Sequence, residues 1–143
     1  MKKFFAIFAL IATVIVFSCT KPEPPKPDCE INHYGSVTVK NETGYNIWVD
    51  VTWGNIVENY EKLLYNGNSY KYTNIPAGNI EIWYTYTGND WYYNYENLSA
   101  CEDMTYRWYR SGKGADSDIS LDILDSNGTV MKTITKFEKS TKK

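Results

Sequence analysis

The sequence predicts an all-β fold, an antiparallel β-sandwich of about seven or eight short strands. Aromatic residues make up 16% of the 143 residues, with 13 Tyr and 5 Trp, and such residues favour pleated sheets. Apolar and polar residues alternate with a period of two in several segments. Turn clusters rich in Gly, Asn and Pro separate these segments by roughly 8–12 residues, which is typical of sandwiches and barrels.

Two alternating segments open the folded part of the chain. Residues 34–40 place Val37 and Val39 on one face, and residues 45–53 show the clearest alternation in the sequence. A turn cluster at 41–44 joins the two segments. This order predicts a hairpin of neighbouring strands.

The segment 56–65 is ambiguous between strand and helix. Its apolar residues recur at helical spacing and it contains no Gly or Pro, yet its neighbours are strands. A strand is the first prediction, and a helix packed on an open α+β sheet is the alternative. Short strands follow at 70–73 and 80–86, separated by a turn at 74–79 that contains Pro and Gly.

The C-terminal half continues the same pattern. An aromatic cluster at 91–95 follows a turn, and we expect it in or beside a loop, where binding residues concentrate. Strands are predicted for residues 104–110, 118–123 and 129–137. The Asn127-Gly128 pair predicts a hairpin between the last two of them. An immunoglobulin-like or transthyretin-like sandwich fits this number of strands.

The first nineteen residues have the three parts of a secretory signal. Lys2 and Lys3 precede an apolar run of about 14 residues, and Ser18 stands directly before Cys19. A spanning helix needs roughly 20 apolar residues, so we expect this segment to be removed rather than retained in the membrane.

The end of this signal, Val16-Phe17-Ser18-Cys19, resembles the lipobox of bacterial lipoproteins. In that family an aliphatic residue lies three positions before the cysteine and a small residue directly before it. The resemblance implies cleavage before Cys19, attachment of acyl chains such as palmitate to that residue, and anchoring in a membrane of the cell envelope. We expect the outer membrane, either its periplasmic side or the cell surface. An ordinary signal with a chance cysteine and an uncleaved anchor are the alternatives.

A proline-rich linker follows the signal. Residues 19–28 contain four of the five prolines, a composition typical of an extended polyproline II spacer. We therefore divide the chain into a signal peptide at 1–18, the lipidated Cys19 with its linker at 19–28, and a β-sandwich domain at 29–143. Loss of the signal changes the formal net charge from −2 to −4, which argues against nucleic acid as a partner.

Two cysteines remain for the folded domain, Cys29 and Cys101. An even number in an oxidising compartment predicts a disulfide between them, with two buried free thiols as the alternative. The chain has one histidine, His33, and no Cys-x-x-Cys pair, so we predict neither a metal site nor another cofactor.

Motifs for catalysis are missing from the sequence. His33 has no evident nucleophile partner and is expected at the surface or at a helix cap. No phosphate-binding loop or nucleophile elbow occurs, so we predict that the protein is not an enzyme. The aspartates between 116 and 125 lack the spacing of a calcium loop, and Asp118 and Asp122 fit a solvated strand face.

The candidate ligand-binding residues are aromatic: Trp48, Trp83, Trp91, Tyr92 and Tyr93. If the strands of Trp48 and Trp83 share a sheet, these rings form an exposed patch beside Asp50 and Glu81. The first hypothesis is a protein-interaction or accessory module that contacts an envelope protein, and the alternative is a glycan-binding surface lipoprotein. A coplanar row of rings favours sugar, a broad apolar patch favours protein, and cross-strand packing gives the rings a purely structural role.

Overall fold

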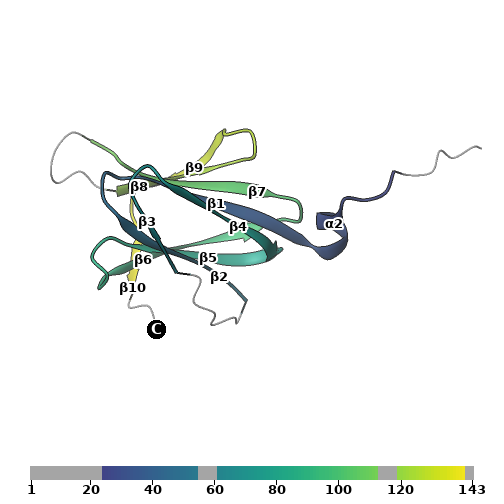
Figure 1. Ribbon diagram of the computed structural model, residues 1–143, viewed down its shortest axis with the longest axis horizontal. Helices are drawn as coiled ribbons and strands as arrows, with labels where there is room; N and C mark the ends of the chain where they lie inside the picture. The colour runs from purple at the N-terminus through teal and green to yellow at the C-terminus, as the bar shows by residue number, and fades with distance from the viewer. Residues whose placement is uncertain (1–23, 55–60, 113–118, 141–143) are drawn as a thin grey trace, which may run out of the picture.

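The structure is a computed structural model that describes residues 24–54, 61–112 and 119–140, and it confirms the all-β sandwich (Figure 1). Within these residues the strands are β1 Tyr34–Glu42, β2 Ile47–Trp53, β3 Lys62–Leu64, β4 Ser69–Pro76, β5 Gly78–Thr85, β6 Trp91–Leu98, β7 Asp103–Arg110, β8 Ile119–Leu124, β9 Val130–Ile134 and β10 Glu138–Ser140. Sheet A has the order β4-β1-β7-β8-β9, and sheet B has the order β10-β6-β5-β2-β3. The sandwich has two strands more than predicted, because the aromatic cluster at 91–95 belongs to a full strand, β6, and because β10 was not predicted.

The core lies between the two sheets and follows the alternation seen in the sequence. Val37 and Val39 of β1 are fully buried. The inward residues of β2 and β5 are also buried, except for Trp53, which is partly buried against the core. On β7 the inward residues are Met104, Tyr106 and Trp108, as predicted. The ring of Trp108 lies 5.7 Å from that of Tyr84 on the opposite sheet, so aromatic contacts join the two layers.

The predicted hairpin between residues 34–40 and 45–53 is wrong. β1 pairs with β4 and, in parallel, with β7, whereas β2 pairs with β3 and β5 in the other sheet. The buried side chain of Asn41 explains this crossing. Its amide donates to the carbonyl oxygens of Tyr45 (2.7 Å) and Leu64 (2.9 Å), and its oxygen accepts from Thr43. These bonds fix a corner that sends the chain from one sheet to the other.

Four further connections also change sheets, those from β3 to β4, β4 to β5, β6 to β7 and β9 to β10. β4 of sheet A continues through Pro76 and β5 of sheet B begins at Gly78, so the turn predicted at 74–79 shrinks to Ala77. The last predicted strand, 129–137, is shorter than predicted, because β9 of sheet A ends at Ile134, and the unpredicted β10 of sheet B follows it. The segment 56–65 contributes the short edge strand β3, and its residues 56–60 lie outside the described part.

One strand pair departs from the antiparallel pattern. Among the described pairs, β1 and β7 alone run parallel, with Ser36 opposite Asp103 and Glu42 opposite Tyr109. Parallel neighbours need a long connection, and here the chain passes through all of β2 to β6 before it returns. The Asn-Gly hairpin between β8 and β9 is confirmed.

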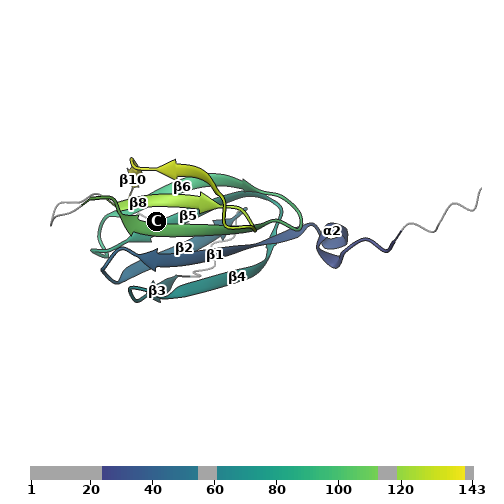
Figure 2. The same cartoon turned by 90° about the horizontal axis from the view of Figure 1, so that it is seen from above.

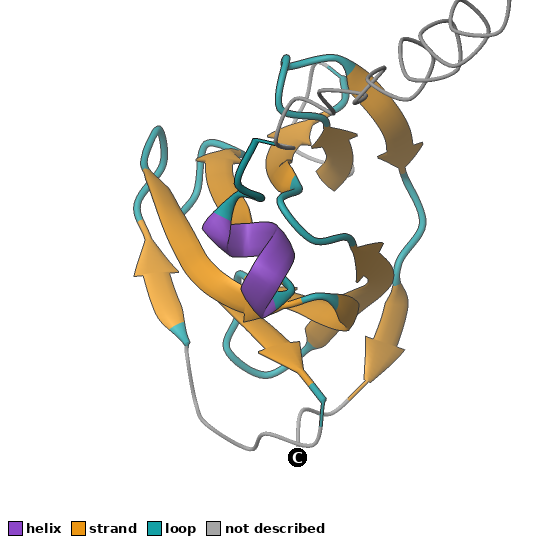
Figure 3. Ribbon diagram, turned by 90° about the vertical axis from the view of Figure 1, so that its right-hand side faces the viewer, coloured by secondary structure: helices purple, strands orange, loops and turns teal. Residues whose placement is uncertain are grey.

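A short helix, α2 Asp28–Asn32, covers one end of the sandwich (Figures 1, 2 and 3). His33 ends this helix in a left-handed conformation (φ 53°) and is exposed, as expected for a capping residue. The described part of the linker leaves the sandwich at this end (Figure 2). Residues 1–23, which include the predicted signal and Cys19, lie outside the described residues.

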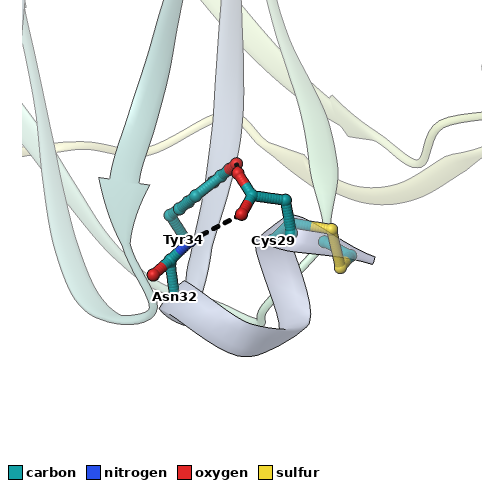
Figure 4. Close-up of a disulfide and its surroundings, with 5 residues drawn as sticks. Cys29, Asn32 and Tyr34 are labelled. Carbon is teal, nitrogen blue, oxygen red and sulfur yellow. Dashed lines mark hydrogen bonds between the residues drawn. A yellow bond between two sulfur atoms is a disulfide. The ribbon is translucent and has the colours of Figure 1, made fainter. Parts of the chain in front are cut away.

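The disulfide between Cys29 and Cys101 is confirmed (Figure 4). It joins α2 to the turn that precedes β7, across 72 residues of sequence. Gly35 permits this turn to lie against β1, because a Cβ there would stand 2.8 Å from the carbonyl oxygen of Glu102. Beside the disulfide, Asp28 accepts hydrogen bonds from Tyr34 (2.6 Å) and Asn32 (2.8 Å) (Figure 4).

Candidate functional site

The outer surface of sheet B, here called the aromatic face, brings together most of the predicted binding residues. It consists of the outward residues of β2, β3, β5 and β6: Trp48, Asp50, Thr52, Leu63, Asn79, Glu81, Trp83, Thr85, Trp91, Tyr93, Tyr95 and Asn97. β2 and β5 are neighbours, so the prediction that Trp48 and Trp83 share a sheet is confirmed. In the ladder, Asp50 lies opposite Trp83, and Trp83 lies opposite Tyr93.

Three rings of the aromatic face contact one another across β5 and β6. The centroids of Trp83 and Tyr93 are 4.7 Å apart with an angle of 32° between their planes, and Tyr95 meets Tyr93 edge-on at 5.2 Å and 80°. Trp48 and Tyr95 are the most exposed aromatic residues of this face, at 39% and 57%. The rings therefore form a rough aromatic surface rather than a flat row.

Trp91 and Tyr92 lie in different surroundings from the other candidates. Both belong to β6, which begins directly after the turn at 86–90, so they lie beside a loop. Trp91 is buried. Tyr92 points to the core side, where its ring stacks on Tyr84 at 5.2 Å and on Tyr86 at 6.4 Å. Burial and the neighbouring tyrosines raise the pKa of Tyr92.

The aromatic face carries negative charge. Glu81 accepts a hydrogen bond from the indole N–H of Trp83 at 3.0 Å, and Asp50, which lies opposite Trp83 in the ladder, is only 1% exposed. No Lys or Arg occupies an outward position on β2, β3, β5 or β6 within the described residues. No described Lys or Arg side chain on the aromatic face therefore offsets the charge of its carboxylates.

The outer surface of sheet A, here called the polar face, differs in this respect. Its cations are paired with anions: Arg107 with Asp122, Lys71 with Asp103 and Lys40 with Glu42, each at 2.5 Å. Asp122 also accepts hydrogen bonds from Thr133 (2.7 Å) and Tyr109 (3.2 Å). The prediction that Asp122 lies on a solvated strand face is wrong, because this network surrounds the side chain and leaves the residue only 4% exposed. Asp118 lies outside the described residues.

The network at Asp122 predicts an acid-sensitive contribution to stability. Burial by itself raises the pKa of Asp122. Hydrogen bonds from Thr133, Arg107 and Tyr109 outweigh burial and hold the pKa below the usual value of a carboxyl group. Because the pKa is lower in the folded state, the stabilisation is present above about pH 4 and is lost as pH falls through the folded pKa.

We expect Asp122→Asn to lower the free energy of unfolding by about 2 kcal/mol at neutral pH, since charged hydrogen bonds are lost. The difference from wild type should shrink below about pH 4, measured by urea unfolding at several pH values. Asp103→Asn removes a more exposed ion pair and should cost less than about 1 kcal/mol. A constant difference across this pH range would contradict the role of the ionised Asp122.

A groove lies at the α2 end of the aromatic face and has a volume of about 780 Å³. Its lining residues are Thr52, Trp53, Gly54, Pro76, Ala77, Gly78, Asn79, Glu81 and Tyr95. The backbone N–H of Ala77 donates to the carbonyl oxygen of His33 at 2.8 Å, which fixes the β4–β5 connection beside α2. The groove therefore has one wall from this connection and a floor from the row Thr52, Glu81 and Tyr95.

Comparison of the chain with protein-family models, curated proteins and solved structures finds no match. Among the described residues, no group of three or more His, Cys, Asp or Glu side chains could hold a metal ion. No helix in the described part of the chain is long and apolar enough to cross a membrane. The function must therefore be argued from the surfaces themselves.

Sequence reasoning placed Tyr95 in the aromatic cluster at 91–95 but not among the five candidate residues, and it missed the groove. Tyr95 shares its face with Tyr93 because the two are separated by one residue on β6, so the period of two supports adding it to the candidates. No sequence pattern indicates the groove. Ala77 and Tyr95 line it together because of the way the neighbouring strands pair, which the sequence does not reveal.

Proposed function

We propose that this protein is a lipid-anchored module of the cell envelope that binds a partner protein through its aromatic face. The observation that carries the proposal is the contrast between the two outer surfaces. The charges of the polar face are paired with one another, whereas the aromatic face combines exposed rings with Asp50 and Glu81 and has no described Lys or Arg. Tyr and Trp are the side chains that contribute most to protein interfaces.

The geometry of the rings favours a protein over a stacked sugar chain. Sugar rings bound in a row need coplanar aromatic surfaces, but Tyr95 stands at 80° to Tyr93 and Trp83 is tilted by 32°. Side chains of a partner protein can fill such an uneven surface, because edge-on and offset aromatic contacts are both favourable. The tilt therefore supports a protein-binding patch.

The anchor is proposed from the sequence around Cys19 and from the linker after it. Residues 20–28 in extended form would span roughly 25–30 Å at about 3.1 Å per residue. Pro27 has the dihedral angles of this form, φ −57° and ψ 149°. The linker reaches the sandwich at the α2 end (Figure 1). The α2 end would therefore be nearest the bilayer, and the aromatic face would lie along the side of the sandwich, free of the bilayer.

The anchor is tested by Cys19→Ala in cells grown with radiolabelled palmitate. The wild-type protein should incorporate label and remain in the membrane fraction, and the variant should do neither or should accumulate as a longer precursor. Cys19→Ala with unchanged mass and unchanged membrane partition would show that the protein is not a lipoprotein. The palmitate label distinguishes acylation from simple retention of the signal.

The aromatic face is tested by a double variant, Trp48→Ala with Tyr95→Ala, expressed in the native host. Both side chains are substantially exposed, so the fold should survive their loss. After chemical cross-linking of intact cells, proteins recovered with wild type should be lost with this variant. The control is Thr105→Ala on the polar face, which should recover the same proteins as wild type. Equal recovery by all three proteins would contradict the proposal.

A further inference from the structure

The groove at the α2 end is lined by three polar side chains of the aromatic face. Its described lining includes the carboxylate of Glu81, the amide of Asn79 and the hydroxyl of Thr52, but no Lys or Arg. An anionic ligand would therefore meet a negative charge without compensation. A long hydrocarbon would cover polar groups and leave their hydrogen bonds unmade. The lining favours a neutral or cationic ligand with many hydroxyl groups.

The polar side chains of the groove are held in place by their neighbours. One oxygen of Glu81 accepts the indole N–H of Trp83 at 3.0 Å, and a carboxylate retains further lone pairs for hydroxyl donors. The oxygen of Asn79 accepts from the Asn97 amide at 3.2 Å, which directs the amide N–H groups of Asn79 to other acceptors. A ligand with both donors and acceptors, such as a hydroxyl group, matches this pair.

Tyr95 supplies an apolar surface at the edge of the groove. The residue is 57% exposed, and its ring meets that of Tyr93 edge-on at 5.2 Å, a contact that restrains the orientation of the ring. A pyranose ring has one face of C–H groups, which packs on an aromatic ring while the hydroxyl groups at its rim form hydrogen bonds. A single ring next to a carboxylate and an amide can therefore hold one sugar unit, although it cannot hold a row.

We propose that this groove binds one neutral or amino sugar unit of a glycan, with Tyr95 stacked on the pyranose and with Glu81 and Asn79 bonded to its hydroxyl groups. The site excludes uronic and sialic acids, because their carboxylates would face Glu81. Its volume of about 780 Å³ lies in the range of small-ligand pockets. The proposal does not depend on a protein partner for the aromatic face.

The test uses the full-length lipoprotein in a detergent without a sugar headgroup. Binding to an array of neutral, amino and acidic saccharides is followed by calorimetric titration of the hits. The intrinsic fluorescence of the five tryptophans is recorded in parallel, because Trp53 lines the groove and contributes to it. Saturable binding of neutral or amino sugars, with acidic sugars at least about tenfold weaker, supports the proposal. The proposal is overturned if no neutral or amino sugar binds, or if acidic sugars bind more tightly than neutral ones.

Matched variants locate the binding in the groove. Tyr95→Ala should weaken binding by about five- to tenfold, whereas Tyr95→Phe should retain it because the ring remains. Glu81→Gln should bind neutral sugars as wild type does. It should no longer bind amino sugars more tightly than neutral ones, and it should bind acidic sugars. Tyr86→Ala, which removes an exposed tyrosine from the β5–β6 turn, should have no effect. Unchanged binding in Tyr95→Ala would overturn the site.

Discussion

Replacement of both Cys29 and Cys101 by serine should lower the free energy of unfolding by about 4 kcal/mol, the value that chain entropy gives for a loop of 72 residues. The bond holds α2 against the turn before β7, where Gly35 allows β1 and this turn to approach closely. Loss of the bond should release this end of the sandwich first. Urea unfolding of the oxidised protein and of the double serine variant measures the difference.

The control for this prediction is Cys19→Ser, which changes a cysteine outside the sandwich and should leave the unfolding midpoint unchanged. Reduction of the wild-type protein should reproduce the loss seen in the double variant. A loss below about 1 kcal/mol would mean that the disulfide does not constrain the unfolded chain as the loop length requires.

Replacement of Trp108 by alanine should lower the free energy of unfolding by about 3–5 kcal/mol, as large aromatic truncations in cores do. Trp108 has no exposed surface, and its ring contacts Tyr84 of sheet B at 5.7 Å and Tyr106 of its own strand at 6.3 Å. The cavity would therefore open between the layers, where neither sheet can close it without moving. Thermal and urea unfolding report the loss.

The variant Trp108→Phe separates packing from hydrogen bonding. Within the described residues the indole N–H of Trp108 has no hydrogen-bond partner, so its removal leaves no acceptor unsatisfied. Most of the ring volume remains, and we expect less than half of the loss seen with alanine. Equal losses in the two variants would show that the contact between the layers is not what stabilises this position.

The period of two predicted which residues of β1, β2, β5 and β7 face the core. Val37 and Val39 on β1, and Met104, Tyr106 and Trp108 on β7, are buried as their alternation requires. The prediction works because one face of each sheet is covered by the other sheet, and a shift of one residue would expose every apolar side chain. The disulfide was predicted from the even number of cysteines left for the folded domain and from the expectation of an oxidising compartment.

The partner of each strand could not be predicted from the same pattern. The alternation in β1 and β2 is compatible with a hairpin, yet the bonds of Asn41 to Tyr45 and Leu64 turn the chain into the other sheet. One of these bonds joins residues 23 positions apart, which no local pattern encodes. The strand β10 was missed for the same reason, because it depends on pairing with residues of β6 that lie more than 40 residues earlier in the chain.

The candidate site was predicted in part. Trp48 and Trp83 share an outer face because their strands are neighbours. The sequence showed that the patch requires these strands to share a sheet, but it did not show that they do. Trp91 and Tyr92 looked equivalent to Tyr93 in the sequence, although one is buried and the other stacks on Tyr84. The groove depends on the approach of the β4–β5 connection to Tyr95, which only the assembled sheets provide.

Site-specific photo-cross-linking in living cells tests the central claim most directly, that the aromatic face is the binding surface. A photoreactive phenylalanine derivative is placed at Trp48 or Tyr95 on the aromatic face and, in matched proteins, at Thr38 or Thr105 on the polar face. We expect discrete cross-linked products from the two positions on the aromatic face and none from the two positions on the polar face. The same products from both faces, or products from the polar face alone, would contradict it.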